Sequence, residues 1–572
     1  MTETDSIRRN DIDWLRIFAT YLLFFFHAAM IFSPAPFFHV RNAEVAFPVL
    51  VFAGFVSLWH MPLFFVLAGW SILSSLRTRG VGSFVGERVR RLLIPLMAGV
   101  VLFGPMIKYL ELRTGLDMNH AGLRATAEMR DTYADVMPEP LPVAPSFDET
   151  FAEFVPTFFT DLERFTWSHL WFVAYLFTFS LLYCGVFARL ARAPAHQGPP
   201  ARVGAAWVYA PIVPLALIQV LLRPHWPGIQ NLYDDWANFA FYSTFLTLGF
   251  LLARFPAFED AVHRESRRAA LTALAVVLLL LAGLLGAFRS DSVMLAGSAA
   301  AGWLLIVAIL GFARRRLTAD SAALEYLRES AMPVYILHQP AVVVFGYVVV
   351  GWSLGISAKF VLIVAMSIVA TVSFYLGFVR YVPFLRAIFG MKPVARDGVA
   401  PAVRYASAAL LVLALLVASA ARAAESDPVG LWWAEGGAAK VEVSRCGQQL
   451  CATVAWLRHP FDEHGCELRD DHNPDDAMRA RPVVGVRILD GLHRSPGEEA
   501  AWSGGAIYDP GSGNTYRCSL RMDGTDRIRI RGYVGLPIFG RTTTWIRVGA
   551  EQRTCTAAAD RTVSLGEDTR AR

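Results

Sequence analysis

The sequence predicts an α-helical polytopic membrane domain of about ten spans plus one linking span, followed by a small all-β antiparallel barrel. The chain of 572 residues is 55% hydrophobic and only 18% charged, which is too apolar for a soluble globule of this length. Many windows hold more than about 18 predominantly apolar residues, the length that spans a bilayer. The last third instead shows short alternating runs between turn-forming residues, a pattern typical of strands. The net charge of +5 is small, and no long basic run suggests a nucleic-acid partner.

Ten apolar segments before residue 390 predict the membrane spans, because each can cross about 30 Å of hydrocarbon. Arg8 and Arg9 precede the first segment, and arginine clusters recur in alternate loops. The positive-inside rule therefore places the N-terminus in the cytoplasm. The loop 111–165 is long and acidic, which makes a strongly anionic substrate less favourable there. The predicted spans are 12–33, 46–76, 89–110, 168–188, 204–222, 236–253, 269–287, 292–312, 331–350 and 358–379.

An eleventh apolar segment sets the domain boundaries. It has a basic flank at Arg404, an apolar core and small residues that end in an "ARA"-like site, as signal peptides do, but it lies in the middle of the chain. We interpret it as a linking span that exports the tail, and the sequence leaves open whether the chain is cleaved near Ala424. The predicted domains are a membrane domain at 1–395, the linking span at 396–426, a periplasmic barrel at 427–550 and a flexible tail at 551–572.

The exported segment contains about eight β-prone runs, which favour a small antiparallel barrel. Five of the six cysteines fall in this last third, which suggests an oxidising compartment. In "CGQQLC", Cys446 and Cys451 flank the expected hairpin turn "GQQL", so a cross-strand disulfide is predicted, with two free thiols as the alternative. A zinc site is less favoured because no matched His or Cys pair lies at ligand spacing, and we predict no metal. The pairing of Cys466, Cys518 and Cys555 is left open.

Arg16 and His27 are the first candidates for chemistry, because ionisable groups inside a span usually face a protein interior or a wet cavity. They lie eleven residues apart, so they project to roughly the same side of a helix, about 16 Å apart along its axis. Arg16 can bind an anionic group such as a phosphate, and His27 can act as a general base. The alternative is that Arg16 is a positive-inside anchor and His27 a hydrogen-bonded core histidine.

Further polar residues recur inside the predicted spans. His60 precedes Pro62, which can break or kink its helix. His169 lies at the outer end of a span, and His338 lies in "ESAMPVYILHQP", where Glu329 and Ser330 are expected at a helix start. The alternatives are interfacial placement for His169 and a helix-packing hydrogen bond for His338. Histidines in several spans favour a cavity lined by these side chains. No serine or cysteine is visibly paired with a base in the sequence, so a nucleophile that carries a covalent intermediate is not predicted.

The segments "DWLRIFATYLLFFFH", "MPLFFVLAGW", "ERVRRLLIPL", "SHLWFV" and "SAMPVYILHQP" occur in this order within residues 7–395 and resemble the membrane acyltransferase family 3, especially its glucan-modifying branch. In that family a basic residue and a histidine separated by ten residues in the first span are both needed for transfer, and Arg16 and His27 match them. The resemblance implies an acyl-CoA-like donor used from the cytoplasmic side as co-substrate, with no permanently bound cofactor. It also implies an acetyl- or succinyl-type acyl group and a hydroxyl of a periplasmic or cell-surface glycan as acceptor.

The resemblance also suggests roles for the other polar residues. Arg16, with Arg88 and Arg91, is expected to hold the phosphates of the donor. His338 and His169 are expected to orient the acceptor or to stabilise the oxyanion. The protein is therefore expected in a bacterial inner membrane, with the bilayer, acyl-CoA and a glycan as partners and periplasmic glucan-synthesis proteins as candidate partners.

The tail resembles a small exported bacterial domain family with a lipocalin-like barrel, on the segments "CGQQLC", "DDHNPD", "WSGGAIYDPGSGNTY" and "RGYVGLPIFGRTTTW". Its glycine and aromatic motifs are either elements of barrel closure or part of a barrel that binds glycan or lipid. Two other functions remain for the whole chain. One is a transporter of glycan, lipid or acyl donor with an intramembrane histidine proton relay, which the absence of a convincing internal repeat disfavours. The other is a degenerate membrane anchor, which Arg16 and His27 disfavour.

Overall fold

The structure is a computed structural model that describes most of the chain. The described residues are 9–35, 38–119, 122–126, 142–144, 147, 149–193, 203–226, 228, 230–288, 290–352, 354–392, 427–434, 437–447, 449–462, 465–495, 501–522, 527–534 and 540–548. They form two compact units, which we call the membrane unit (described residues up to 392) and the barrel (described residues from 427 onward). The predicted linking span 396–426, the cleavage position near Ala424 and the predicted tail 551–572 lie outside the described residues.

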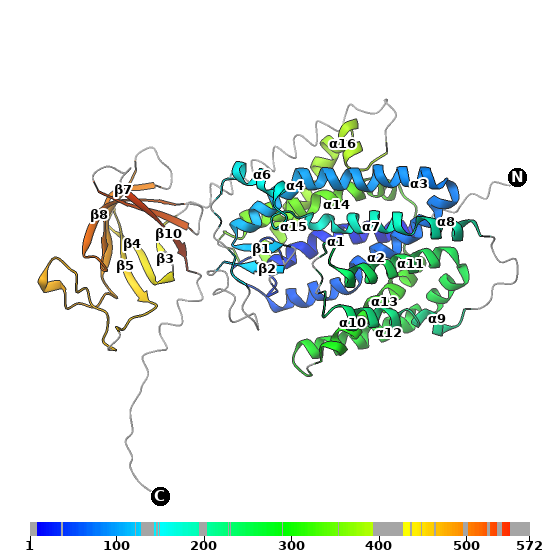
Figure 1. The fold of residues 1–572 in the computed structure, drawn as a ribbon, viewed down its shortest axis with the longest axis horizontal. Helices are drawn as coiled ribbons and strands as arrows, with labels where there is room; N and C mark the ends of the chain where they lie inside the picture. Colours follow the sequence, from blue (N-terminus) through cyan, green and yellow to red (C-terminus); the bar gives the residue numbers. More distant parts are fainter. Residues whose placement is uncertain are drawn as a thin grey trace, which may run out of the picture. The chain divides into compact units, whose positions relative to one another are not determined.

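Long helices make up the membrane unit, and Figure 1 shows most of them lying side by side. The helices are α1 (Asn10–Ile31), α2 (Phe47–Thr78), α3 (Val81–Arg88), the π-helical turn η1 (Val89–Leu93), α4 (Ile94–Arg113), α6 (Phe151–Thr160), the 3-10 turn η2 (Ser168–Leu170), α7 (Trp171–Leu182), α8 (Cys184–Arg192), α9 (Ala205–Tyr209), α10 (Ile212–Leu222), α11 (Trp236–Arg254), α12 (Pro256–Leu284), α13 (Asp291–Arg316), α14 (Ala322–Val349), α15 (Ile356–Phe374), the π-helical turn η3 (Tyr375–Val379) and α16 (Pro383–Ile388). A short hairpin of β1 (Leu116–Asn119) and β2 (Gly122–Ala125) follows α4.

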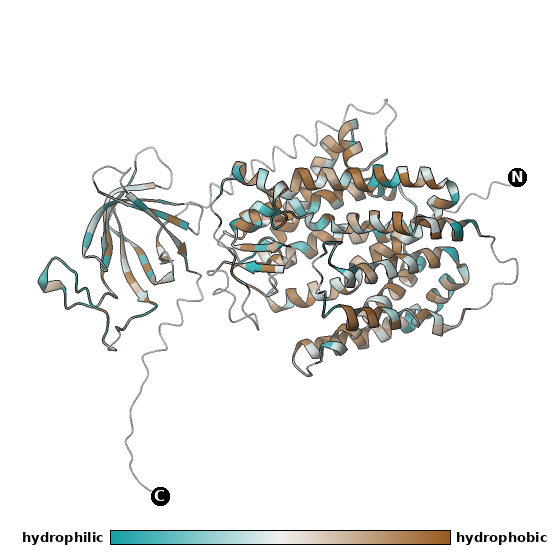
Figure 2. Cartoon of the chain, in the orientation of Figure 1, coloured by the Kyte–Doolittle hydropathy of each residue, from teal (hydrophilic) through white to brown (hydrophobic). Residues whose placement is uncertain are grey.

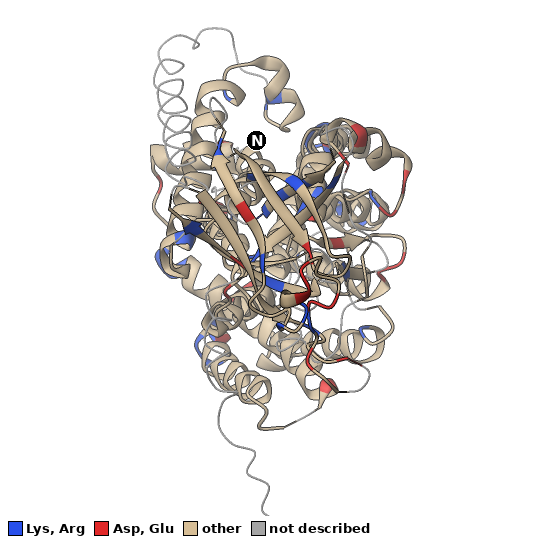
Figure 3. Cartoon of the chain, turned by 90° about the vertical axis from the view of Figure 1, so that its left-hand side faces the viewer, with Lys and Arg blue, Asp and Glu red and all other residues tan. Residues whose placement is uncertain are grey.

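The predicted membrane spans are confirmed in type, and their number is nine or ten against the predicted ten. Within the described part of the chain, 9 helices are long and apolar enough to cross a bilayer. The pair formed by η2–α7 and α8, bent by 60°, brings the number to 10 if it counts as one span. Figure 2 shows hydrophobic residues over most of the helical ribbon, and in Figure 3 most of the ribbon is tan, that is, neither acidic nor basic. The protein is therefore a polytopic membrane protein.

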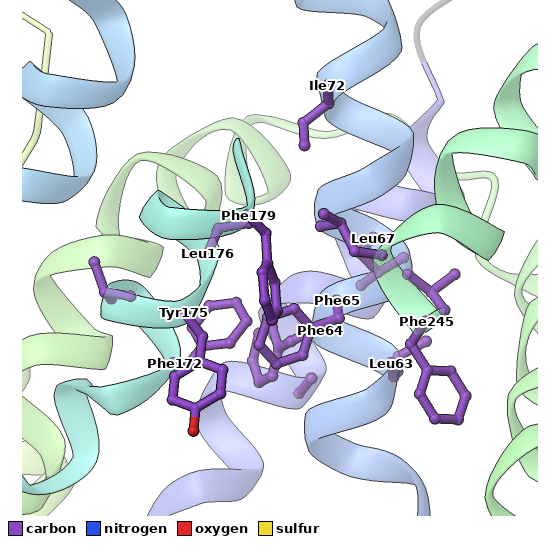
Figure 4. Close-up of a cluster of buried hydrophobic side chains, with 14 of the residues drawn as sticks. Leu63, Phe64, Phe65, Leu67, Ile72, Phe172, Tyr175, Leu176, Phe179 and Phe245 are labelled. Carbon is purple, nitrogen blue, oxygen red and sulfur yellow. The ribbon is translucent and has the colours of Figure 1, made fainter. Parts of the chain in front are cut away.

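Aromatic side chains fill the centre of the membrane unit, where α2, α7 and α11 meet (Figure 4). Phe65 of α2 is fully buried, and its ring lies 4.8 Å from the rings of both Phe172 on α7 and Tyr242 on α11. Lipid tails are as apolar as these side chains, so close packing rather than exclusion of water stabilises such contacts. This rigid centre fixes α7, which follows directly on the turn that carries His169.

Pro62, which can break or kink a helix, leaves α2 continuous from Phe47 to Thr78. The helix start expected at Glu329 and Ser330 is wrong. Glu329 and Ser330 lie inside α14 rather than at its start, because the Ser321 hydroxyl accepts a hydrogen bond from the Leu324 backbone N–H at 3.1 Å and caps the helix nine residues earlier than residue 330. The predicted span began at 331 because the polar first turns of α14 are not hydrophobic.

The barrel confirms the predicted antiparallel fold. Its strands close in the order β10-β3-β4-β5-β6-β7-β8-β9. Buried and exposed residues alternate along them, as Val441, Glu442 and Val443 show on β4. The interior is filled with side chains that include Trp432, Leu489 and Trp545, as expected for eight strands. The strands are β3 (Gly430–Trp433), β4 (Ala439–Cys446), β5 (Gln449–Leu457), β6 (Arg487–Arg494), β7 (Ala501–Asp509), β8 (Asn514–Met522), β9 (Arg527–Tyr533) and β10 (Gly540–Arg547).

The disulfide between Cys446 and Cys451 is confirmed, with their Cα atoms 5.9 Å apart. The predicted four-residue turn is wrong, because Cys446 pairs directly with Gln449 and only two residues separate the strands. Gly447 has a φ of +67°, which the tight turn requires and which glycine adopts without strain. Cys466 and Cys518 are free thiols, and Cys555 lies outside the described residues.

Candidate functional site

Three histidines from three separate helical segments meet inside the membrane unit. The His27 ring of α1 stacks on the His338 ring of α14, with ring centroids 5.2 Å apart and planes 28° apart. The His169 ring of η2 meets the His338 ring edge-on at 5.1 Å. His338 is fully buried and His169 nearly so, whereas His27 is partly buried. The structure thus brings together the three histidines that the sequence analysis proposed as a catalytic group, which we call the histidine cluster.

A proline in α14 determines which nitrogen of His169 is available. Pro340 has no backbone N–H, so it leaves the Ile336 carbonyl without its usual helical partner. The Nε2–H of His169 donates to that carbonyl at 3.0 Å, and the Tyr335 hydroxyl donates to the His169 carbonyl. The Nδ1 of His169 is therefore the unprotonated nitrogen, and it is buried without a hydrogen-bond partner among the described residues.

The His338 ring is oriented in the same way by its own helix. Its Nδ1–H donates to the Tyr335 carbonyl at 2.6 Å, which leaves Nε2 unprotonated. Nε2 of His338 and Nδ1 of His27 are both buried, and neither has a partner in the part of the chain that the structure describes. Buried polar atoms are normally hydrogen-bonded, so three such nitrogens in one cluster indicate a place where polar groups of a ligand bind.

His27 lies toward the end of α1 opposite to Arg16. Its other face stacks on the Phe38 ring, with centroids 5.5 Å apart. Arg16 donates to the Ser71 hydroxyl of α2 at 3.0 Å and pairs with Asp13 at 3.2 Å. The structure therefore places Arg16 and His27 on one helix that connects two regions of the membrane unit, and it does not bring them into contact.

The other two candidate donor-binding residues lie at the Arg16 end. Arg88 lies within electrostatic range of Arg16, and its guanidinium covers the Phe84 ring at 4.7 Å. Its Nε is buried and has no hydrogen-bond partner among the described residues. Arg91 pairs with Glu87 at 3.5 Å. The three arginines thus form a cationic group in which Arg16 is paired with Asp13 and Arg91 with Glu87.

His60 has a structural role and is not part of the histidine cluster. Its Nε2–H donates at 2.8 Å to the Ala19 carbonyl, so it ties α2 to α1. Its ring is buried against Phe64 at 5.2 Å. This is the hydrogen-bonded core histidine that the sequence analysis offered as an alternative for other positions.

A second polar group, which was not predicted from the sequence, lies beside the cluster. His39 contacts the Glu111 carboxylate through Nδ1, and its Nε2 lies 3.0 Å from the Ser168 hydroxyl and 2.8 Å from the Gln339 amide nitrogen. Lys108 also binds Glu111, at 2.6 Å. The signal was present in "KYLE" at residues 108–111, where two charges interrupt an apolar helix, but the predicted span ended at 110 and left Glu111 in a loop.

A metal site is a different possibility for clustered histidines. Within the described residues, no group of three His, Cys, Asp or Glu side chains is arranged to hold a metal ion. The cluster's three histidines meet through stacked and edge-on rings.

Two family models match parts of the chain. A family model described as "acyltransferase domain" matches residues 9–378, and one described as uncharacterized proteins conserved in bacteria (DUF2147) matches residues 430–547. Glucans biosynthesis protein C from Escherichia coli strain SMS-3-5 is 23% identical over 419 residues, which cover 69% of this chain and 98% of that protein. The protein of the same name from Escherichia coli strain HS is also 23% identical over 419 residues, with the same coverage.

One solved structure also resembles part of the chain. It is a protein from Helicobacter pylori described as belonging to the lipocalin family, 20% identical, which matches 22% of this chain and 86% of its own with a TM-score of 0.19. That score is too low to support an argument, and the closed eight-strand order of the barrel itself carries the description of its fold.

Proposed function

This chain belongs to the acyltransferase domain family over residues 9–378, and from that premise we propose that it moves an acyl group from a cytoplasmic acyl-CoA-like thioester to a hydroxyl of a periplasmic or cell-surface glycan. The acyl group is of acetyl or succinyl type. The protein lies in the inner membrane of a bacterium, with its N-terminus in the cytoplasm and the barrel in the periplasm. The name of its relatives, glucans biosynthesis protein C, supports a glucan as the acceptor.

The histidine cluster is the observation that carries this proposal. Acyl transfer to an alcohol needs a base that removes the hydroxyl proton, and a neutral imidazole is suited to this near pH 7. His27 is the proposed base, because it is the most accessible member of the cluster and its buried Nδ1 has no partner among the described residues. It takes the proton of the glycan hydroxyl, whose oxygen bonds to the acyl carbon.

Of the two roles expected for His338 and His169, orienting the acceptor and stabilising the oxyanion, we propose only the first. An oxyanion needs hydrogen-bond donors, but the free nitrogens of these two rings carry lone pairs, because their protonated nitrogens already donate to carbonyls. In their neutral forms they accept hydrogen bonds from hydroxyl groups. Orienting the acceptor sugar is therefore the role we propose for them, in preference to stabilising an oxyanion.

The cationic end of α1 supports donor binding from the opposite side. Arg16 lies within electrostatic range of Arg88, and guanidinium groups bind phosphates through several hydrogen bonds at once. The helical rise puts Arg16 about 16 Å from His27 along α1. A donor held by its phosphates at Arg16 thus has to reach along the helix to deliver its acyl group. Arg16 and Arg91 already pair with Asp13 and Glu87. Arg88, whose buried Nε has no hydrogen-bond partner among the described residues, is therefore the cation most available to a phosphate.

The barrel is proposed to bind glycan or lipid through its outer face or its loops. Its interior is occupied by side chains such as Trp432 and Leu489, so a ligand would not enter as in a hollow barrel. The acyl-transfer chemistry is assigned wholly to the membrane unit, because every residue named for it precedes residue 392.

Mass spectrometry of glycans from cells that carry the wild type, His27→Ala or a chain truncated after residue 400 tests the proposal. We expect the acyl mass to disappear in His27→Ala at equal protein level and to persist in the truncated chain. Unchanged acylation in His27→Ala together with altered glycan export would contradict the proposal and favour a transporter.

A further inference from the structure

Ser168, His39 and Glu111 form a chain of contacts that resembles the serine–histidine–carboxylate arrangement of acyl-transfer enzymes in geometry. The Ser168 hydroxyl lies 3.0 Å from His39 Nε2, and His39 Nδ1 contacts the Glu111 carboxylate on the other side of the ring. The three residues come from different parts of the fold. His39 follows α1, Glu111 lies in the last turn of α4, and Ser168 begins η2.

The burial of the three residues suits the roles of nucleophile, base and positioning carboxylate that such an arrangement has. Glu111 is fully buried and His39 is 5% exposed, whereas Ser168 is only partly buried. Lys108 binds the other oxygen of Glu111 at 2.6 Å, and the Met118 backbone N–H donates to it at 2.7 Å, so the carboxylate is held in place. A carboxylate that accepts the Nδ1–H of His39 fixes the tautomer in which Nε2 carries the lone pair. Glu111 is thus a positioning residue for His39.

The backbone at Ser168 supplies an independent observation. Its φ is +47°, a region that residues other than glycine rarely adopt and that often marks functional positions. The Ser168 backbone N–H donates to the Thr166 hydroxyl at 2.9 Å, which holds this strained turn. The turn presents the hydroxyl to His39 at the start of the helix.

Gln339 connects this group to the histidine cluster. Its amide nitrogen lies 2.8 Å from both Ser168 Oγ and His39 Nε2. When that N–H donates to Oγ, the His39 lone pair is left for the proton of the Ser168 hydroxyl. The amide oxygen of Gln339 is buried and has no partner among the described residues, and His338 is its neighbour in sequence. Ser168 itself precedes His169 of the cluster.

We infer that Ser168 is a nucleophile that carries the acyl group covalently between donor and glycan. This inference rests on the proposed function and deepens it. In the first step Ser168 Oγ gives its proton to His39 and bonds to the acyl carbon, the carbon–sulfur bond breaks, and the proton passes from His39 to the leaving thiolate. In the second step the glycan hydroxyl gives its proton to His27 and bonds to the acyl carbon. The ester bond to Oγ breaks, and Oγ regains a proton from His27.

A covalent intermediate predicts a partial reaction that needs no glycan. Full-length protein in detergent is incubated with succinyl-CoA or acetyl-CoA and isotopically labelled free CoA, without acceptor. We expect the label to enter the acyl-CoA pool, and a peptide that contains Ser168 to carry the acyl mass. A parallel reaction with glucan measures the complete transfer.

The variants are chosen so that folding and chemistry separate. Ser168→Gly removes the hydroxyl and suits the positive φ, so the turn is retained, and the exchange rate is expected to fall at least about 10³-fold. Ser168→Cys retains a nucleophile and is expected to carry the acyl mass as a thioester. Ser180→Ala is the control, because Ser180 is a buried serine of α7 whose hydroxyl has no partner among the described residues, and exchange should stay at the wild-type rate.

The two proposals fail in different ways. Acylated glucan without exchange, or exchange that survives in Ser168→Gly, would overturn the covalent role of Ser168 and leave the acyltransferase function standing. Neither product nor exchange with either thioester would overturn the proposed function itself.

Discussion

At the scale of single residues, the chemistry of the histidine cluster depends on which ring nitrogens are already hydrogen-bonded. Pro340 frees a carbonyl that takes one nitrogen of His169, and a carbonyl one turn back takes one nitrogen of His338. The remaining nitrogens are acceptors in a buried place. His60 differs because its donor nitrogen ties two helices together, which is a structural task. The three histidines of the cluster thus each have a nitrogen without a partner among the described residues, whereas His60 ties two helices together.

Asp470 in the barrel gives a prediction about pH. Burial alone would raise its pKa, but hydrogen bonds from Tyr508 at 2.6 Å, Asn473 at 2.7 Å and Arg481 at 2.8 Å outweigh burial and hold the pKa of Asp470 below its ordinary value. A carboxyl with a depressed pKa in the folded state stabilises the fold above its unfolded pKa of about 3.9, and this contribution is lost as the pH falls through the folded value. The barrel should therefore lose stability in acid.

Asp470→Asn should reduce this acid sensitivity, because the amide does not titrate. It should also cost about 1–3 kcal/mol at pH 7 through its weaker hydrogen bonds. The measurement is the midpoint of urea unfolding of the barrel at pH 7 and at pH 3. Unfolding is detected by the reaction of dithiodipyridine with the Cys518 thiol, which is buried in the folded barrel. If the wild type and the variant lose the same amount of stability between pH 7 and pH 3, Asp470 does not cause the acid sensitivity.

The sequence alone predicted part of the site and missed the rest for a physical reason. Arg16, His27, His169 and His338 lie within or at the end of apolar spans, where any ionisable residue is conspicuous. His39 lies between spans, and its partner Glu111 is 72 residues away in the chain. No local sequence pattern predicts a contact between residues so far apart in the chain, so the His39–Glu111 contact is visible only in the folded structure.

At the scale of elements, glycines rather than large side chains determine how closely the central helices approach. A Cβ added at Gly69 of α2 would lie 2.0 Å from the Leu246 carbonyl oxygen of α11, and one added at Gly249 of α11 would lie 2.0 Å from the Val66 oxygen. The two backbones are therefore in direct contact, as small residues allow between membrane helices.

Gly69→Ala and Gly249→Ala should each destabilise the membrane unit by about 1–3 kcal/mol, because the backbone of the facing helix cannot move aside cheaply. Gly54→Ala in the same α2 is the control, since its Cβ would meet nothing within 4 Å among the described residues. That change should be neutral or slightly stabilising because alanine favours helix. Thermal unfolding of the full chain in detergent distinguishes them, and equal midpoints for all three variants would refute the close contact.

Element types were predictable, whereas their ends and interruptions were not. Hydropathy located every span, but it missed the polar first turns of α12, which begins at Pro256, and of α14, which Ser321 caps. Pro62 can break or kink a helix, yet α2 runs continuously through it. The Leu58 carbonyl, four residues before the proline, lies against Gly302 of α13, 2.5 Å from the position of a Cβ added there.

At the scale of the whole molecule, the chain combines a membrane acyltransferase with a disulfide-bonded barrel. Disulfides persist in oxidising compartments, so the bond between Cys446 and Cys451 supports the proposed periplasmic position of the barrel. Ten crossings from the proposed cytoplasmic N-terminus, followed by the predicted linking span, would also place the barrel in the periplasm.

The free thiols of the barrel provide a test of this topology. Cys466 is exposed, whereas Cys518 is buried and its burial raises the pKa of the thiol to about 12. A membrane-impermeant maleimide added to intact spheroplasts should label Cys466 and leave Cys518 unlabelled, because only a thiolate reacts. Labelling of Cys466 that appears only after lysis would place the barrel in the cytoplasm.

The central claim is that His27 acts as the base in an intramembrane acyl transfer, and its most direct test is the transfer rate from labelled acyl-CoA to glucan by purified protein in proteoliposomes. His27→Ala should lower the rate per folded molecule at least about 10²-fold. His60→Ala should reduce the amount of folded protein, since it removes a buried tie between α1 and α2, while each folded molecule keeps a rate close to that of the wild type. A His27→Ala protein that turns over at the wild-type rate per folded molecule would contradict the account.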